Sequence, residues 1–319
     1  MIKSVGRPMT KNLFESLPKI KNQTLAVLNG VLGDTLTEQK SGLAIEMSLS
    51  SEKQGERVCI FVHGLCASNS SWKYTENKNK SYGSLLEKSR GYTPIYINYN
   101  SGLHVSTNGK ALSKLISQHC KKSSTTIKEI IFIGHSMGGL VIRSACHYAK
   151  KSRASWVKKT RKIFLLGTPH HGNDYEKLGN LTSSVLKRVP NAVTKGIASL
   201  GNKRSAGIKD LRFGNLLDED WQGHDPDALL QDNRQFVPLL KNVDYYIIAG
   251  SLAKEKDNIF TQYFGDGVVP KRTAAGKSFS KSKTIPFLAN HFKEIKGVSH
   301  ARLPRHTKVY AQIRKWCDL

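Results

Sequence analysis

Residues 128–150 read KEIIFIGHSMGGLVIRSACHYAK, and this stretch decides the fold. Four consecutive apolar residues, 130–133, have the composition of a strand that is buried on both faces of a parallel sheet. After the pentapeptide GHSMG (residues 134–138), apolar residues recur at helical spacing. The stretch therefore predicts a strand, a tight turn and a helix, with Ser136 at the apex of the turn.

A serine at such an apex is placed to act as a nucleophile. A sharp strand-to-helix turn exposes the Ser136 hydroxyl above the sheet edge, and the next backbone N–H lies at a helix N-terminus. Gly134 and Gly138 carry no side chains that would clash across the turn. The alternative is a serine in an ordinary strand–helix turn, and the residues that follow must distinguish the two interpretations.

Strands and helices alternate on both sides of this stretch. Strands are expected at residues 44–49, 57–63, 93–99, 162–166, 243–249 and 292–295, and helices at residues 23–40, 82–88, 107–122 and 307–316. This alternation indicates βαβ units and a mostly parallel sheet with helices on both faces. Residues 173–240 interrupt the alternation, and we expect them to form a cap or lid within a single domain of residues 1–319.

Composition limits the partners and the location of the protein. No stretch of the 319 residues approaches the roughly 18 apolar residues of a membrane-spanning helix, and the lysine-rich N-terminus lacks the apolar core of an export signal. Five scattered cysteines without a C-x-x-C motif are typical of reduced thiols in the cytoplasm. We therefore expect a cytoplasmic protein. The sequence leaves its oligomeric state open.

The chain is strongly basic, with 50 Lys and Arg against 24 acidic residues and a formal charge of +26. Such a charge favours an anionic partner, either nucleic acid or an anionic membrane surface. Zinc-finger spacing, an RNA-binding aromatic signature and a basic zipper are all missing from the sequence. We expect no nucleic acid partner and favour peripheral contact with a membrane. A solvated basic surface with no partner is the alternative.

A serine nucleophile needs a base, and the base needs a third group to orient it. On a sheet of this kind the order along the chain is serine, then an acid, then histidine. Asp266 follows Gly265 in a loop behind a strand, where active-site groups of open α/β sheets lie. The other aspartates after the serine lie in the expected cap, in a lysine-rich loop, at the start of a strand or at the chain end.

The base is expected at the end of the last strand. His300 ends that strand before the final helix, whereas His291 precedes the strand and His306 lies near the start of the helix. Order and placement therefore predict a catalytic triad of Ser136, Asp266 and His300.

Two backbone N–H groups should stabilise the developing oxyanion. One is that of Met137, directly after the nucleophile, and the other that of Leu65, in the loop after residues 57–63. His63 is expected to brace this loop rather than to titrate in the mechanism. His135 adjoins the nucleophile, but we expect its side chain to point away.

Five motifs, VHGL, GHSMGG, GTPHHG, GDGVVP and GVSHARL, occur in this order. Together they resemble the α/β-hydrolase superfamily, and most of all its lipase/esterase branch, which includes bacterial triacylglycerol lipases and GPI-inositol-deacylase-like proteins. The resemblance spans roughly residues 57–316. It implies an eight-stranded sheet, the Ser-Asp-His triad, no organic cofactor and hydrolysis of carboxylic esters. Some such lipases bind calcium, but no ligand pair can be matched here, and we expect no metal.

The hypothesis from sequence is therefore a serine hydrolase that forms an acyl-enzyme on acyl or lipid esters. A greasy acyl chain is expected because the cap region contains apolar residues, namely Leu178, Leu181, Val185, Leu186, Val193, Ile197 and Leu200. Packing in a helical core is the other role open to them. One alternative is an acyltransferase that passes the acyl group to an alcohol. Another is a non-catalytic hydrolase scaffold that binds anionic membranes.

Overall fold

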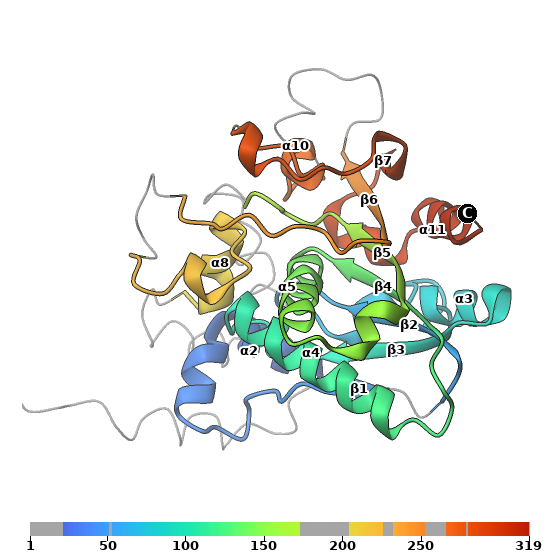
Figure 1. The fold of residues 1–319 in the computed structure, drawn as a ribbon, viewed down its shortest axis with the longest axis horizontal. Helices are drawn as coiled ribbons and strands as arrows, with labels where there is room; N and C mark the ends of the chain where they lie inside the picture. The colour runs from blue at the N-terminus through green and yellow to red at the C-terminus, as the bar shows by residue number, and fades with distance from the viewer. Residues whose placement is uncertain are drawn as a thin grey trace, which may run out of the picture.

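The structure is a computed structural model that describes residues 22–50, 53–172, 204–225, 232–252, 266–278 and 280–318. In this part of the chain seven strands form one sheet in the order β1-β3-β2-β4-β5-β6-β7 (Figure 1). Neighbouring strands pair in parallel, except that β1 is antiparallel to β3. This is the α/β-hydrolase architecture that the sequence predicted.

The strands are β1 (Ser48–Ser50), β2 (Arg57–Val62), β3 (Thr93–Asn98), β4 (Glu129–His135), β5 (Thr160–Leu166), β6 (Asp244–Ser251) and β7 (Phe292–Lys296). The α-helices of the described part are α2 (Asn22–Glu38), α3 (Tyr82–Arg90), α4 (Val105–Lys122), α5 (Met137–Lys151), α8 (Ala206–Phe213), α10 (Lys271–Ala274) and α11 (Thr307–Cys317). A 3-10 helix, η6 (His300–Arg305), joins the loop after β7 to α11.

The inner strands are buried on both faces because apolar side chains follow one another without interruption. In β2, Val58, Ile60 and Val62 pack into the core beneath α2, α4 and α5. Cys59 and Phe61 point to the opposite face, where α3 and α11 cover the sheet. Side chains alternate between the two faces of a strand, so each inner strand contributes to two separate cores. Figure 1 shows α4 and α5 in front of the sheet.

The edge of the sheet at β1 differs from the expectation. A strand was expected at residues 44–49, but β1 covers only Ser48–Ser50. The side chain of Asn29, on α2, binds the Leu43 carbonyl and the Ile45 N–H. These backbone groups are therefore unavailable to the sheet. The eight strands implied by the family resemblance are also wrong for the described residues, because residues 22–47 contribute α2 and a loop instead of a further strand.

The expected cap at residues 173–240 can be followed only in part, because residues 173–203 and 226–231 lie outside the described residues. All the apolar cap residues between Leu178 and Leu200 fall in the first of these gaps. Within the described part, α8 contacts α2, and Ile208 and Leu211 are buried in the core beneath α2, α4 and α5. This portion of the segment is thus part of the domain core.

Two further findings concern the described residues as a whole. None of their helices combines the length and apolarity that crossing a membrane requires. Each of the five cysteines is a free thiol.

Candidate active site

Ser136 lies between β4 and α5, at the turn that the sequence predicted. Its backbone has φ 54° and ψ −124°, a region that non-glycine residues rarely occupy. The Ser136 N–H donates to the Leu166 carbonyl at 2.8 Å, which ties the turn to the end of β5. Strain of this kind is retained where the surrounding structure enforces it, and here the turn places Ser136 in the wall of a cavity.

The glycines of the turn are required by close packing. A Cβ atom on Gly138 would lie 2.2 Å from the Val62 carbonyl oxygen, and one on Gly134 would lie 2.8 Å from the Gly139 Cα atom. The start of α5 therefore approaches the end of β2 at a distance that only glycine permits. This contact brings Ser136 next to the loop that follows β2.

Asp266 and His300 form a buried pair at the same edge of the sheet. His300 Nδ1 lies 2.7 Å from Asp266 Oδ2, and the two residues are 5% and 2% exposed. The second carboxylate oxygen of Asp266 accepts hydrogen bonds from the N–H groups of Val268 and Val269. Because an ionised carboxylate can only accept, the ring proton is on Nδ1, and Nε2 presents a lone pair.

Ser136 and His300 line one cavity of about 300 Å³. Its other walls come from the loop after β2, from α2 and from η6. Within the described residues, His300 Nε2 is buried and has no hydrogen-bond partner. The structure thus brings the predicted base to the predicted nucleophile without a hydrogen bond between them, and such contacts often tighten only when substrate binds.

The two predicted oxyanion donors lie on either side of the serine. Leu65 lines the cavity beside Ser136, and Met137 is the first residue of α5. In the described part of the chain neither backbone N–H is engaged with an acceptor. The loop carrying Leu65 is held in a constrained shape, since Cys66 has φ 57° and its N–H donates to Ser101 Oγ at 3.0 Å.

Two other histidines near the site have structural roles. His63 is fully buried, stacks on Tyr99 and donates from Nδ1 to the Gly64 carbonyl at 2.9 Å, and burial lowers its pKa to about 4. His135 donates from Nε2 to the His300 carbonyl at 3.0 Å. Burial lowers the pKa of His135 well below its usual value. His63 therefore braces the loop as expected, and His135 lines the cavity together with Ser136.

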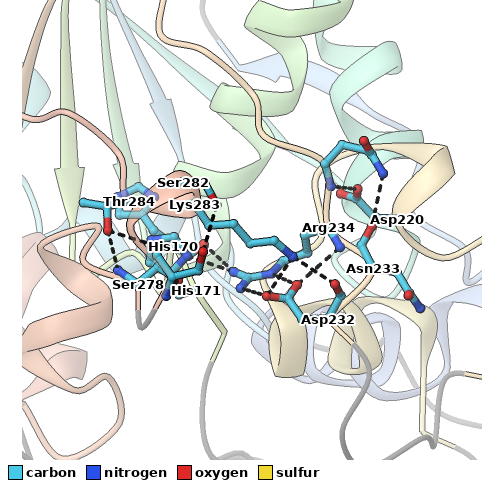
Figure 2. Close-up of polar contacts among 12 residues, drawn as sticks. His170, His171, Asp220, Asp232, Asn233, Arg234, Ser278, Ser282, Lys283 and Thr284 are labelled. Carbon is cyan, nitrogen blue, oxygen red and sulfur yellow. Dashed lines mark hydrogen bonds and ion pairs between the residues drawn. The ribbon is translucent and has the colours of Figure 1, made fainter.

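A polar cluster behind the site could not be located from the sequence. The loop of residues 167–172 ends β5, and a Cβ atom on its Gly167 would lie 3.0 Å from His300 Nδ1. On the far side of the loop, Arg234 donates to the His170 carbonyl and to His171 Nδ1. Arg234 and Lys283 both bind the Asp232 carboxylate, as Figure 2 shows. This cluster therefore holds His170 and His171, in the loop whose first residue, Gly167, lies beside His300.

Arg305 also lies at the site, and the sequence did not identify it. It lies at the end of η6 and lines the cavity together with Ser136 and His300. The motif GVSHARL ends two residues before it, so only the short 3-10 helix that follows His300 could have indicated its position.

No group of three or more His, Cys, Asp or Glu side chains in the described ranges is placed to bind a metal ion. Sequence analysis also expected no organic cofactor. Neither expectation is tested by a structure of the chain alone.

Comparison with known proteins identifies relatives of this chain. Residues 52–275 match the family described as "Putative serine esterase (DUF676)", a range that contains Ser136 and Asp266 but ends before His300. A search of curated proteins finds no match. Among solved structures, the lipase BlEst2 from Bacillus licheniformis in its mature form is similar, with a TM-score of 0.51 at 17% identity, over 85% of this chain and 97% of that chain.

Two further structures are similar at lower scores. A thermophilic esterase from Thermogutta terrifontis has a TM-score of 0.48 at 16% identity, over 86% of this chain and 93% of that chain. Phospholipase PlaB from Legionella pneumophila has a TM-score of 0.48 at 17% identity, over 82% of this chain and 59% of that chain. The sheet has the α/β-hydrolase fold of lipases and esterases. Because residues 52–275 make up more than half of the chain, this protein belongs to the family described as "Putative serine esterase (DUF676)".

Proposed function

We propose that this protein hydrolyses carboxylic esters of acyl or lipid substrates through a triad of Ser136, His300 and Asp266. The observation that carries the proposal is the buried His300–Asp266 pair, with Nδ1 and Oδ2 2.7 Å apart and with the free Nε2 beside the cavity that Ser136 lines. This arrangement supplies a base in the correct tautomer near a strained serine that lines the same cavity.

The reaction proceeds in two acyl-transfer steps. His300 Nε2 takes the proton of Ser136 Oγ as that oxygen attacks the ester carbonyl, and the N–H groups of Met137 and Leu65 stabilise the resulting oxyanion. The imidazolium then gives its proton to the departing alcohol, leaving an acyl-serine. Water, deprotonated by His300, attacks the acyl-serine. The acid leaves, and the proton returns to Ser136.

The cavity supports an ester with an apolar acyl chain. Apolar side chains of three segments line it, from Val27 on α2, Leu65 and Ala67 after β2, and Pro304 on η6. Its volume of about 300 Å³ is at the lower end for ligand pockets, which favours a short or partly inserted chain.

Active-site labelling tests the triad directly. A fluorophosphonate probe should form an adduct on Ser136, found by mass spectrometry of the peptide, and Ser136→Ala should abolish it. The same variant should keep the thermal unfolding midpoint and reduce turnover by several orders of magnitude. Ser152→Ala, an exposed position at the other end of α5, is the matched control. Adduct formation elsewhere, or normal turnover in Ser136→Ala, contradicts the proposal.

A panel of esters from acetyl to palmitoyl tests the substrate class. Turnover should pass through a maximum at a chain length that the cavity accommodates. Hydrolysis of none of the esters by a folded, probe-reactive protein would point to amide or thioester substrates.

The net charge of +26 supports one addition to the proposal, which is peripheral contact with anionic membranes. Sedimentation with liposomes should show binding that rises with the fraction of anionic lipid and falls with salt. Binding that depends neither on anionic lipid nor on salt would contradict the proposed membrane contact and leave the esterase proposal unaffected.

A further inference from the structure

The cavity beside Ser136 is lined by apolar and uncharged polar side chains and by the cation of Arg305. We propose that Arg305 binds an anionic group of the substrate, a phosphate or a carboxylate, so that the enzyme prefers acyl esters bearing such a group close to the scissile bond. This inference rests on the proposed function, because it assigns the substrate class of the same site.

The guanidinium of Arg305 is not neutralised within the described part of the chain. No ion pair and no hydrogen bond joins it to another described residue, although eight other Lys and Arg side chains there have an acidic partner. Arg305 is also half-buried, so part of its hydration is lost. A half-buried cation without an anion gains more from an incoming oxyanion than an exposed one, because water competes less.

The position of Arg305 is fixed through its backbone. Leu303 and Pro304 are buried, and the Tyr82 hydroxyl lies 2.7 Å from the Leu303 carbonyl. The same hydroxyl accepts a hydrogen bond from the His306 N–H at 2.8 Å. Tyr82 is itself fully buried. The end of η6 is thus held on both sides of Arg305, and only the side chain remains free to meet a ligand.

The other charges around the cavity do not cancel that of Arg305. The described lining contains no carboxylate, and the Asp266 carboxylate lies behind His300, bound to Nδ1. His135 is held neutral, because burial lowers its pKa well below the usual value.

Matched pairs of esters test the inference and locate the anion. The first pair, 4-nitrophenyl butyrate and 4-nitrophenyl hemiglutarate, differs by a carboxylate on the acyl side. The second pair, butyryl glycerol and butyryl glycerol 3-phosphate, differs by a phosphate on the alcohol side. For one pair the wild-type protein should show a higher kcat/KM for the anionic member. That pair identifies whether the anionic group of the substrate is a carboxylate on the acyl side or a phosphate on the alcohol side.

Substitution of Arg305 should remove this preference. In Arg305→Gln the ratio of kcat/KM for the anionic over the neutral member should fall about tenfold, mainly through KM, as expected for one lost charge-assisted hydrogen bond. Arg305→Lys should restore part of the ratio, since it keeps the charge. Arg302→Gln is the control, because this substitution removes the same charge from the same short helix. Arg302 is exposed and does not line the cavity.

The outcomes separate the inference from the proposed function. Equal kcat/KM within both pairs, or an equal fall in Arg302→Gln, overturns the role of Arg305 while ester hydrolysis stands. If a folded protein hydrolyses no ester, the proposed function fails. The anion site can then still be tested by calorimetry, in which hexyl phosphate is titrated into the Ser136→Ala variant. Binding should weaken about tenfold when Arg305→Gln is added, and unchanged binding contradicts the inference.

Discussion

Two hydrogen bonds hold His300 to Asp266: ring Nδ1 donates to the Asp266 carboxylate at 2.7 Å, and the His300 N–H donates to the Asp266 carbonyl at 3.0 Å. The His300 carbonyl in turn accepts a hydrogen bond from His135 Nε2 at 3.0 Å. The ring and both backbone polar groups of His300 are therefore fixed, so little ordering remains to be done when a substrate enters.

Asp266→Asn should abolish activity without unfolding the protein. The amide oxygen can still accept from the Val268 and Val269 N–H groups, which leaves the amide NH₂ facing His300 Nδ1. Nδ1 must then accept, the ring proton moves to Nε2, and the base can no longer take the serine proton. We expect kcat to fall by about 1,000-fold to 10,000-fold. A fall of less than about tenfold in a variant with native circular dichroism would contradict the assigned tautomer.

Gly138→Ala should destabilise the turn at Ser136. The added Cβ would lie 2.2 Å from the Val62 carbonyl oxygen. Neither atom can rotate away, because the oxygen belongs to the backbone and the position of a Cβ is set by its own backbone. Overpacking of this kind costs about 1–3 kcal/mol of the free energy of unfolding, measurable by urea denaturation. Gly42→Ala is the control, because nothing lies within 4 Å of its added Cβ. Equal midpoints for the two variants would show that α5 can shift away from β2.

The buried neutral histidines should make stability fall in mild acid. Burial holds the pKa of His63 at about 4, against 6.5 for the unfolded chain. Between these values the unfolded chain binds a proton that the folded chain does not. The contribution of His63 is therefore complete above pH 6.5 and is lost as the pH falls toward 4, by at most about 3 kcal/mol. His171, whose pKa burial also lowers to about 4, acts in the same direction.

Urea denaturation across this pH range measures the effect. In His63→Gln, the slope of the free energy of unfolding against pH should decrease, because one titrating group has been removed. His224→Gln, at an exposed position, is the matched loss of a histidine and should leave the slope unchanged. Identical slopes for all three proteins would show that His63 binds a proton as readily in the folded protein as in the unfolded chain.

Asp232→Asn should loosen the loop behind the active site. Burial alone would raise the pKa of the Asp232 carboxyl, but hydrogen bonds from Arg234 and Lys283 lower this pKa well below its usual range. The carboxylate is partly exposed, so we expect a loss of only about 1 kcal/mol, and the loss should shrink in high salt. Hydrogen exchange should increase at residues 167–172. Glu56→Gln is the control, because it breaks the exposed ion pair of Glu56 and Lys128 and should leave exchange at residues 167–172 unchanged.

The central strand, the turn and the first helix after it were predictable because each depends on neighbours in the sequence. The apolar run of residues 130–133 requires burial on two faces, and the glycines around Ser136 permit a turn that other residues would block. The order of serine, aspartate and histidine also suggested which groups would meet, and the structure brings Asp266 to His300.

Elements that depend on distant contacts were less accessible. The edge strand was expected to begin at residue 44, but Asn29 binds the backbone at residues 43 and 45, and no local pattern reveals that competition. The placement of α8 in the domain core was missed for the same reason. The apolar residues of α8 could pack in a lid or in the domain core, and only their neighbours in space determine which of the two they join.

By itself, the sequence determined a parallel sheet with a serine at a strained turn, because hydrophobic periodicity and glycine sterics act over a few residues. Only the tertiary structure decided that Arg305 lies in the same cavity as Ser136 and that Arg234, Asp232 and Lys283 support the loop beside His300. The physical reason is that a charge acquires a role through what it faces in space. That environment is set by segments far apart in the chain.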